Sequence, residues 1–305
     1  MTLNLRGIIP PMITPLTEDY KLDETGLKVL IEHLISGGVH GIFLLGSNGE
    51  GPSLSNTIRK ELITKACEYI DKRVPVLVGI TDTSFDGSIE IAEHSKTAGA
   101  DAVVIAPPYY FPISDAEMDE YLNTLIPKLP LPFLLYNMPS CTKMNLSLET
   151  VKKGKELGAL GVKDSSGNLD YLNSLIDAFS DSPEFAVIAG AEGFLPATIE
   201  RGGHGAVAGG ANIFPRLFVD LYDAALAKEE DKIVELLKKV NHINDTIYSV
   251  GKTPSRITKG IKCGVSVLGI CDDYMAMPLH RFGAVERDKV KCHIENFKKE
   301  SMAEL

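Results

Sequence analysis

Alternation between short strand patterns and amphipathic helical patterns limits the fold of this chain more than any other feature of its sequence. Runs rich in apolar and β-branched residues predict eight strands, at residues 7–13, 41–45, 76–79, 102–106, 133–136, 161–163, 186–189 and 205–207. Strands that are separated by helices form βαβ units and a parallel sheet. Eight such units favour a closed (β/α)8 barrel, an α/β fold, over an open sheet.

Helical patterns fill the intervals between these strands, at residues 24–36, 56–70, 85–98, 116–128, 148–157, 169–179 and 193–201. After residue 212 the pattern becomes purely helical, with candidates at residues 214–228, 232–249, 256–268 and 288–299. The first of these is expected to complete the barrel. Since no low-complexity linker follows it, we expect a barrel of residues 1–228 and a C-terminal helical extension of residues 229–305 packed on it.

Composition excludes several classes of protein. A formal net charge of −10 without a Lys/Arg cluster argues against nucleic acid or an anionic membrane as a partner. The chain has 5 cysteines, an odd number, and no CxxC motif. Both features argue against a disulfide framework and fit a reducing compartment. The N-terminal residues show no signal-peptide pattern, and no run of ~18 apolar residues occurs. We therefore expect a cytoplasmic protein.

The residue that ends the sixth predicted strand is a lysine. Active sites of (β/α)8 barrels lie at the C-terminal ends of the strands, so Lys163 is expected to face the barrel mouth. A lysine there must be paired or lose its proton, and a neutral amine attacks carbonyl groups to form a Schiff base. The plainer interpretation is a lysine at a strand edge with its amine in water. The neighbouring residues must decide between the two.

Hydroxyl groups follow the neighbouring strands. Tyr136 ends the adjacent strand, where its phenol could exchange protons with an adduct on Lys163, and Ser47 could relay a proton to that phenol. Tyr110 or Tyr109 could extend the relay. Each tyrosine alone would also fit a packed aromatic ring. The Ser47-Asn48-Gly49 segment fits either a tight turn or an anion nest that receives a carboxylate.

Metal and cofactor chemistry has little support in the sequence. The 7 histidines form no HxH or HExxH pattern, and no Ser–His–Asp set is evident. The glycines of residues 202–210 could cup a phosphate, but helix capping and a close turn are favoured. We expect no metal and no organic cofactor.

Several motifs, taken in order and spacing, carry a resemblance to a known family. They are GSNGE (46–50), PYY (108–110), YNMP (136–139), GVKD (161–164), Gly190 and residues 205–212. Over essentially its full length the chain resembles the dihydrodipicolinate synthase / N-acetylneuraminate lyase family of class I aldolases. The resemblance implies a (β/α)8 barrel, a Schiff-base mechanism without a cofactor, and a homodimer or homotetramer.

The resemblance also implies roles for individual residues. Lys163 matches the Schiff-base lysine, and Tyr136 matches the tyrosine that acts as general acid and base. Ser47 matches the hydroxyl residue that links this tyrosine to a second one. That second tyrosine matches Tyr110, which in many members reaches in from a neighbouring subunit. The positions that contact pyruvate through the backbone match Gly190 and Val207.

Two positions depart from the family pattern. Asn48 stands where the family has a threonine that binds the pyruvate carboxylate, and an asparagine can donate the same bond. Cys141 stands where dihydrodipicolinate synthases have an arginine that holds the carboxylate of the second substrate, and a thiol cannot replace that fork. This substitution argues against synthase activity.

GSNGE and KDSSGN (163–168) are similar instead to aldolases that act on 2-keto-3-deoxy sugar acids or 4-hydroxy-2-oxoglutarate. In sugar-acid lyases, residues at the positions of Ser165 and Glu192 bind substrate hydroxyls; Ser165 would equally fit a helix cap.

We therefore predict a pyruvate-dependent aldolase that cleaves a 2-keto-3-deoxy acid reversibly to pyruvate and a small aldehyde. The first alternative is 4-hydroxy-tetrahydrodipicolinate synthase, which condenses pyruvate with aspartate semialdehyde. The second is a non-catalytic protein that binds a 2-oxo acid; the presence of both Lys163 and Tyr136 argues against it.

Overall fold

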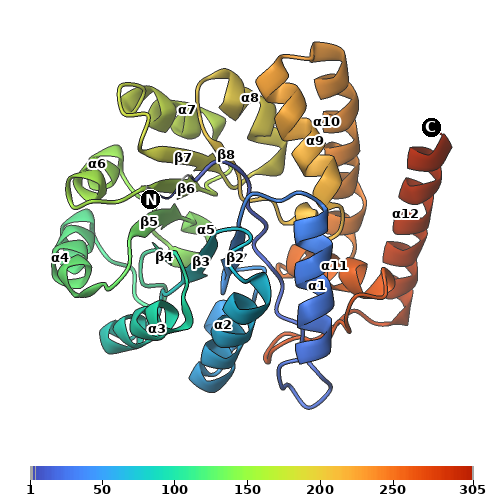
Figure 1. Ribbon diagram of the computed structural model, residues 1–305, viewed down its shortest axis with the longest axis horizontal. Helices are drawn as coiled ribbons and strands as arrows, with labels where there is room; N and C mark the ends of the chain where they lie inside the picture. Colours follow the sequence, from blue (N-terminus) through green and yellow to red (C-terminus); the bar gives the residue numbers. More distant parts are fainter. Residues whose placement is uncertain (1–2, 4, 304–305) are drawn as a thin grey trace.

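Eight parallel strands form the centre of the molecule. The computed structural model describes residue 3 and residues 5–303, with side chains up to residue 299. The strands pair in the order β1-β8-β7-β6-β5-β4-β3-β2. Their bounds are β1 Gly7–Ile8, β2 Ile42–Leu44, β3 Val76–Gly79, β4 Ala102–Ile105, β5 Phe133–Asn137, β6 Gly161–Asp164, β7 Ala186–Ala189 and β8 Gly205–Ala206. Figure 1 shows the helices arranged around these strands, which confirms the predicted (β/α)8 barrel.

The barrel closes through a segment that the sequence predicted as one strand, residues 7–13. Within this segment only residues 7 and 8, which form β1, are a regular strand, and they pair with β8. Beyond it, Pro11 bridges to Phe43 of β2, and the Met12 amide donates to the Phe43 carbonyl at 2.9 Å. The prediction of a continuous strand was wrong because Pro10 and Pro11 have no N–H to donate to a ladder.

The helices of the barrel begin close to their predicted positions because each of six has a polar N-cap. They are α1 Glu24–Ser36, α2 Asn56–Ile70, α3 Phe85–Ala98, α4 Asp115–Leu125, α6 Leu148–Glu156, α7 Leu169–Ala178, α8 Leu195–Glu200 and α9 Pro215–Ala227. The side chains that accept a backbone N–H at an N-cap are Asp23, Ser55, Ser84, Ser114, Ser147 and Asn168.

Several predicted helix bounds were wrong, for local reasons. The expected helix 116–128 is α4 followed by the 3₁₀ turn η2 (Ile126–Lys128), since Pro127 lacks an N–H to donate. The expected helix 193–201 is the 3₁₀ turn η3 (Glu192–Phe194) followed by α8. The short helix α5 (Pro139–Thr142) was not predicted at all.

Apolar side chains pack in two layers, one inside the barrel and one between the strands and the helices. Along β5, Leu134 and Tyr136 belong to the inner layer, and Phe133 and Leu135 belong to the outer one. Since successive side chains of a strand point to opposite faces, this alternation turns Tyr136 into the barrel and Asn137 outward.

The C-terminal residues form α10 (Glu230–Asp245), the 3₁₀ turn η5 (Ile247–Ser249), α11 (Arg256–Val267) and α12 (Ala284–Ala303). The expected single helix 232–249 is broken at Thr246, whose φ of −114° and ψ of −79° lie outside helical geometry. α10 packs beside α9, and α12 lies against α11 at the periphery (Figure 1). A domain boundary at residue 228 remains our proposal. No helix in the described part of the chain combines the length and apolarity needed to cross a membrane.

Candidate active site

Lys163 and Tyr136 lie side by side at the ends of neighbouring strands. They are register partners in the β5–β6 ladder, and both side chains turn into the barrel. The Lys163 Nζ lies 4.0 Å from the centroid of the Tyr136 ring and 5.2 Å from that of Phe43. The lysine is only 6% exposed, and no carboxylate among the described residues pairs with it. The amine therefore lies against two aromatic faces and forms no ion pair with a described carboxylate.

The turn after β2 brings a hydroxyl to the phenol of Tyr136. Ser47 Oγ lies 3.4 Å from Tyr136 Oη, a distance at which either group can donate. Asn48, the next residue, accepts a bond from the Thr258 hydroxyl at 3.4 Å through its side-chain oxygen. Because Thr258 belongs to α11, this turn links the strand end of the barrel to the C-terminal helices.

The residues that follow Tyr136 and Lys163 lock the two strand ends together. Asn137 Nδ2 donates to Asp164 Oδ1 at 2.8 Å, and the Asn137 side-chain oxygen accepts from the Leu146 amide. Burial raises the pKa of the Asp164 carboxyl, while hydrogen bonds from Asn137 and Ser166 oppose that rise. Since both members of the pair are buried and bonded, they fix the positions of the preceding side chains.

Gly190 lets the ends of β6 and β7 approach closely. A Cβ built at this position would lie 1.9 Å from Ser165 Oγ and 2.8 Å from the Asp164 carbonyl oxygen. The Gly190 amide donates to that same carbonyl at 2.6 Å. Any side chain here would push the lysine strand out of place.

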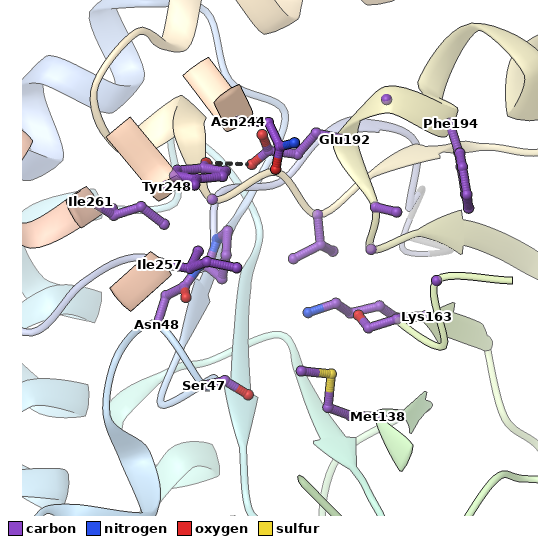
Figure 2. A pocket seen from close by; sticks show the side chains of 18 of the residues that line it. Ser47, Asn48, Met138, Lys163, Glu192, Phe194, Asn244, Tyr248, Ile257 and Ile261 are labelled. Atoms are coloured by element: carbon purple, nitrogen blue, oxygen red, sulfur yellow. Dashed lines mark hydrogen bonds between the residues drawn. The ribbon is translucent and has the colours of Figure 1, made fainter. Parts of the chain in front are cut away.

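A cavity of about 380 Å³ opens from the barrel mouth toward the C-terminal helices (Figure 2). Its volume falls within the range of small-molecule sites. The structure brings eight of the predicted site residues to its wall: Ser47, Asn48, Tyr136, Lys163, Ser165, Gly190, Glu192 and Val207.

Tyr110 is the one predicted site residue that does not reach this cavity. It is 68% exposed, and its ring packs edge-on against Phe111, which is 72% exposed. The single chain therefore places both aromatic rings on the outer surface.

The far end of the cavity holds a carboxyl group. Glu192 Oε1 accepts bonds from the Tyr248 hydroxyl at 2.9 Å and from the Gly210 amide at 2.6 Å. Burial raises the pKa of the Glu192 carboxyl, and these hydrogen bonds oppose that rise. Burial next to Glu192 also raises the pKa of the Tyr248 phenol well above its usual value. Figure 2 shows this pair beside Asn244, across the cavity from Lys163.

Sequence reasoning missed the cavity residues that come from outside the strand ends. Those contributed by α10, η5 and α11 are Val240, Asn241, Asn244, Tyr248, Ile257 and Ile261; Met138 and Phe194 also line the wall. The helical pattern predicted these helices, but no signal in it identified which face turns toward the barrel.

A buried ion pair anchors the same helices to the strand ends. Lys262 Nζ lies 2.6 Å from Glu50 Oε1, and neither side chain is exposed. Glu50 Oε2 also accepts from the Ala276 amide at 2.7 Å. Burial lowers the pKa of Lys262, and the nearby Glu50 opposes that change. The pair joins the GSNGE turn, which carries Ser47 and Asn48, to α11.

Acidic residues, cysteines and histidines do not gather into a metal site. Within the described residues, no group of three or more of these side chains is arranged to hold an ion.

Comparisons with known proteins agree with this geometry. The model of the dihydrodipicolinate synthetase family matches residues 4–297. A relative described as the putative 2-dehydro-3-deoxy-D-gluconate aldolase YagE of Escherichia coli K12 is 37% identical over 221 residues, which cover 72% of this chain and 73% of YagE.

Two solved structures are similar over nearly the whole chain. The dihydrodipicolinate synthase of Bacteroides thetaiotaomicron has a TM-score of 0.93 and 46% identity, covering 97% of this chain and 100% of that one. YagE in complex with pyruvate has a TM-score of 0.91 and 31% identity, covering 96% and 99% of the two chains.

The fold and the family model together define a barrel enzyme of the class I aldolase and lyase type. The chain belongs to the dihydrodipicolinate synthetase family.

Proposed function

We propose that this enzyme is a pyruvate-dependent class I aldolase that cleaves a 2-keto-3-deoxy sugar acid reversibly to pyruvate and an aldehyde. The observation that carries the proposal is the buried Lys163 amine, 4.0 Å from the Tyr136 ring centroid at the wall of the cavity. A lysine without a carboxylate partner in an aromatic site is suited to attack a carbonyl carbon.

In the proposed reaction, the neutral Lys163 amine adds to the 2-oxo carbon of the substrate. The Tyr136 phenol gives its proton to the departing hydroxyl, so that water leaves a protonated imine and a Tyr136 phenolate. The phenolate takes the proton from the C4 hydroxyl while the C3–C4 bond breaks, and the electron pair of that bond moves into the imine to give an enamine. The aldehyde departs. Tyr136 then returns this proton to C3, which restores the protonated imine, and water adds to it and passes a proton to the phenolate as pyruvate and the free amine are released.

Other residues support this chemistry in the proposal. Ser47, 3.4 Å from the Tyr136 oxygen, relays the proton. Asn48 and the backbone at Gly190 and Val207 hold the pyruvate end. Tyr110 joins the relay from a second copy of the chain in a homodimer or homotetramer, a role that its exposure in the single chain fits.

The choice of a sugar acid as substrate rests on two observations. YagE, at 37% identity, is described as a putative aldolase of 2-dehydro-3-deoxy-D-gluconate. Ser165 and Glu192 bring a hydroxyl and a carboxyl to the cavity, where they would bind substrate hydroxyls.

The second candidate is 4-hydroxy-tetrahydrodipicolinate synthase, which the 46% identity to the Bacteroides thetaiotaomicron structure favours. Its second substrate, aspartate semialdehyde, carries a carboxylate that needs a cationic partner. Cys141, in α5, supplies none, and no arginine is among the described residues that line the cavity.

Two measurements test the proposal. Borohydride reduction in the presence of pyruvate should attach a reduced adduct to Lys163, as read by peptide mass spectrometry. Pyruvate release should be assayed separately from 2-keto-3-deoxygluconate, 4-hydroxy-2-oxoglutarate and N-acetylneuraminate. Release from the first with an adduct at Lys163 supports the proposal. An adduct without release, together with condensation of pyruvate and aspartate semialdehyde, would replace it with the synthase. No adduct would refute the imine mechanism.

A further inference from the structure

We propose that the face of α10 bearing Asn241 and Asn244 recognises the far end of the substrate and selects an uncharged, hydroxylated tail over one that ends in a carboxylate. This inference rests on the proposed aldolase function and assigns the part of the site that distinguishes one aldehyde from another.

The position of the two amides is the first argument. Asn241 and Asn244 are three residues apart on α10 and therefore share one face of the helix. Both line the cavity that contains Lys163. α10 packs against η3, the turn that carries Glu192, and Figure 2 shows Asn244 beside Glu192, across the cavity from Lys163. A substrate joined to Lys163 through its second carbon would extend its tail toward this face.

Unused hydrogen-bonding capacity is the second argument. Neither side-chain amide, Asn241 or Asn244, hydrogen-bonds to another residue in the described part of the chain. Each amide offers two donors and an acceptor, and hydroxyl groups both donate and accept. Glu192 Oε1, by contrast, is already engaged by Tyr248 and Gly210. The amides of α10 are therefore available to a polyol.

Charge is the third argument. Among the described residues that line the cavity, Lys163 is the only basic side chain and Glu192 the only acidic one. In the proposed mechanism Lys163 is bonded to the second carbon of the substrate, so Glu192 is the one acidic or basic side chain that this described lining offers to the tail. A second carboxylate on the substrate would meet this acid with no further cation among the described residues that line the cavity, which disfavours it. Neutral amides beside one acid suit a tail that donates hydrogen bonds.

Aldol synthesis from pyruvate and three small aldehydes tests the inference directly. Glyceraldehyde carries two hydroxyls, propionaldehyde has the same three carbons without them, and glyoxylate carries a carboxylate. The variants are Asn241→Leu and Asn244→Leu, which keep the approximate size and remove the polar atoms. Asn123→Leu is the matched control, because Asn123 is exposed on α4 and outside the cavity.

For the unaltered enzyme we expect kcat/KM to be highest with glyceraldehyde. Each cavity variant should lower kcat/KM for glyceraldehyde by about 3- to 10-fold, the usual effect of losing one neutral hydrogen bond, and leave propionaldehyde within about twofold. The control should change neither. Asn244→Lys should raise the ratio of glyoxylate to glyceraldehyde, since it places a cation at the tail end.

Borohydride trapping of pyruvate on Lys163 in the same variants distinguishes a failure of the proposed role of α10 from a failure of the aldolase proposal. Trapping that persists while the preference for glyceraldehyde is lost supports the inference. Trapping that persists with an unchanged preference overturns the role of α10 and leaves the aldolase proposal standing. Failure of trapping in the unaltered enzyme refutes the aldolase proposal itself, and this inference with it.

Discussion

The two ends of the cavity are built from different kinds of structure. At one end, Lys163 and Tyr136 are neighbours in the β5–β6 ladder, and Asn137 and Asp164 lock the strands immediately after them. At the other end, Asn241 and Asn244 lie on an exposed helix face with no locking partner in the described chain. Rigid strands hold side chains in fixed positions, whereas side chains on a helix packed against the barrel can be substituted without disturbing the strand register.

The comparison predicts that changes at the strand end abolish chemistry, that changes at the Glu50–Lys262 ion pair reduce stability, and that changes at the helix end alter selectivity and the pH dependence of stability. Four substitutions test this order.

Replacement of Lys163 should have the largest effect. Lys163→Ala removes the proposed nucleophile, so kcat for pyruvate release should fall by about 10⁴-fold or more. The adduct in borohydride trapping should vanish as well. Lys128→Ala, at an exposed lysine of η2, is the control and should match the unaltered enzyme. Retention of more than a hundredth of the activity would mean that another group forms the covalent intermediate.

Removal of the Tyr136 hydroxyl should come next. Tyr136→Phe keeps the ring that packs against Phe43 but removes the proposed acid and base, so kcat should fall by about 10³-fold. Thermal unfolding should be nearly unchanged, which separates chemistry from folding. Tyr20→Phe, at an exposed tyrosine, controls for the loss of a hydroxyl. A kcat within tenfold of the original would exclude Tyr136 as the proton carrier.

Disruption of the ion pair that joins the GSNGE turn to α11 should lower stability. Lys262→Met keeps the packing volume but leaves the buried Glu50 carboxylate without its partner, at a cost of about 3 kcal/mol in the free energy of unfolding. Denaturation with urea measures this quantity. The double variant with Glu50→Gln should recover part of the loss, because no unpaired charge then remains.

The matched control for this pair is Lys60→Met. Lys60 lies at the same 2.6 Å from Glu90, but both side chains are partly exposed. An exposed pair contributes little, so the change should be much smaller. Equal losses in the two variants would mean that burial does not decide the strength of the Glu50–Lys262 pair.

The smallest expected effect concerns the pH dependence of stability at the helix end. Burial raises the folded-state pKa of Glu192 above its usual value of 4.5, so folding takes up a proton in that range. The free energy of unfolding should therefore fall as the pH rises from the usual value through the raised one. Glu192→Gln cannot ionise and should lack this contribution.

Urea denaturation of both proteins between about pH 4 and pH 8 measures the difference. Contributions from the other ionisable groups cancel when the two curves are subtracted. Parallel curves would show that the Glu192 carboxyl has the same pKa in the folded and unfolded chains.

Much of the fold could be predicted because its signals are local. Strand periodicity, N-cap residues such as Ser84 and Ser114, and the alternation of strands with helices are properties of neighbouring residues. The errors were local as well, since prolines at positions 10, 11 and 127 interrupted elements that the apolar pattern alone would have continued.

The strand patterns placed Tyr136 and Lys163 within one residue of the ends of β5 and β6, which are Asn137 and Asp164, and a barrel topology brings strand ends to one mouth. The order of the strands along the chain therefore sufficed to predict that Lys163, Tyr136, Ser47 and Glu192 lie near one another. The exposure of Tyr110 outside the cavity of the single chain, and the positions of Asn241 and Asn244 at the cavity wall, became visible only in the folded chain. The direction in which a helix face points depends on packing between residues far apart in the chain, and the spacing of residues within the helix does not encode it.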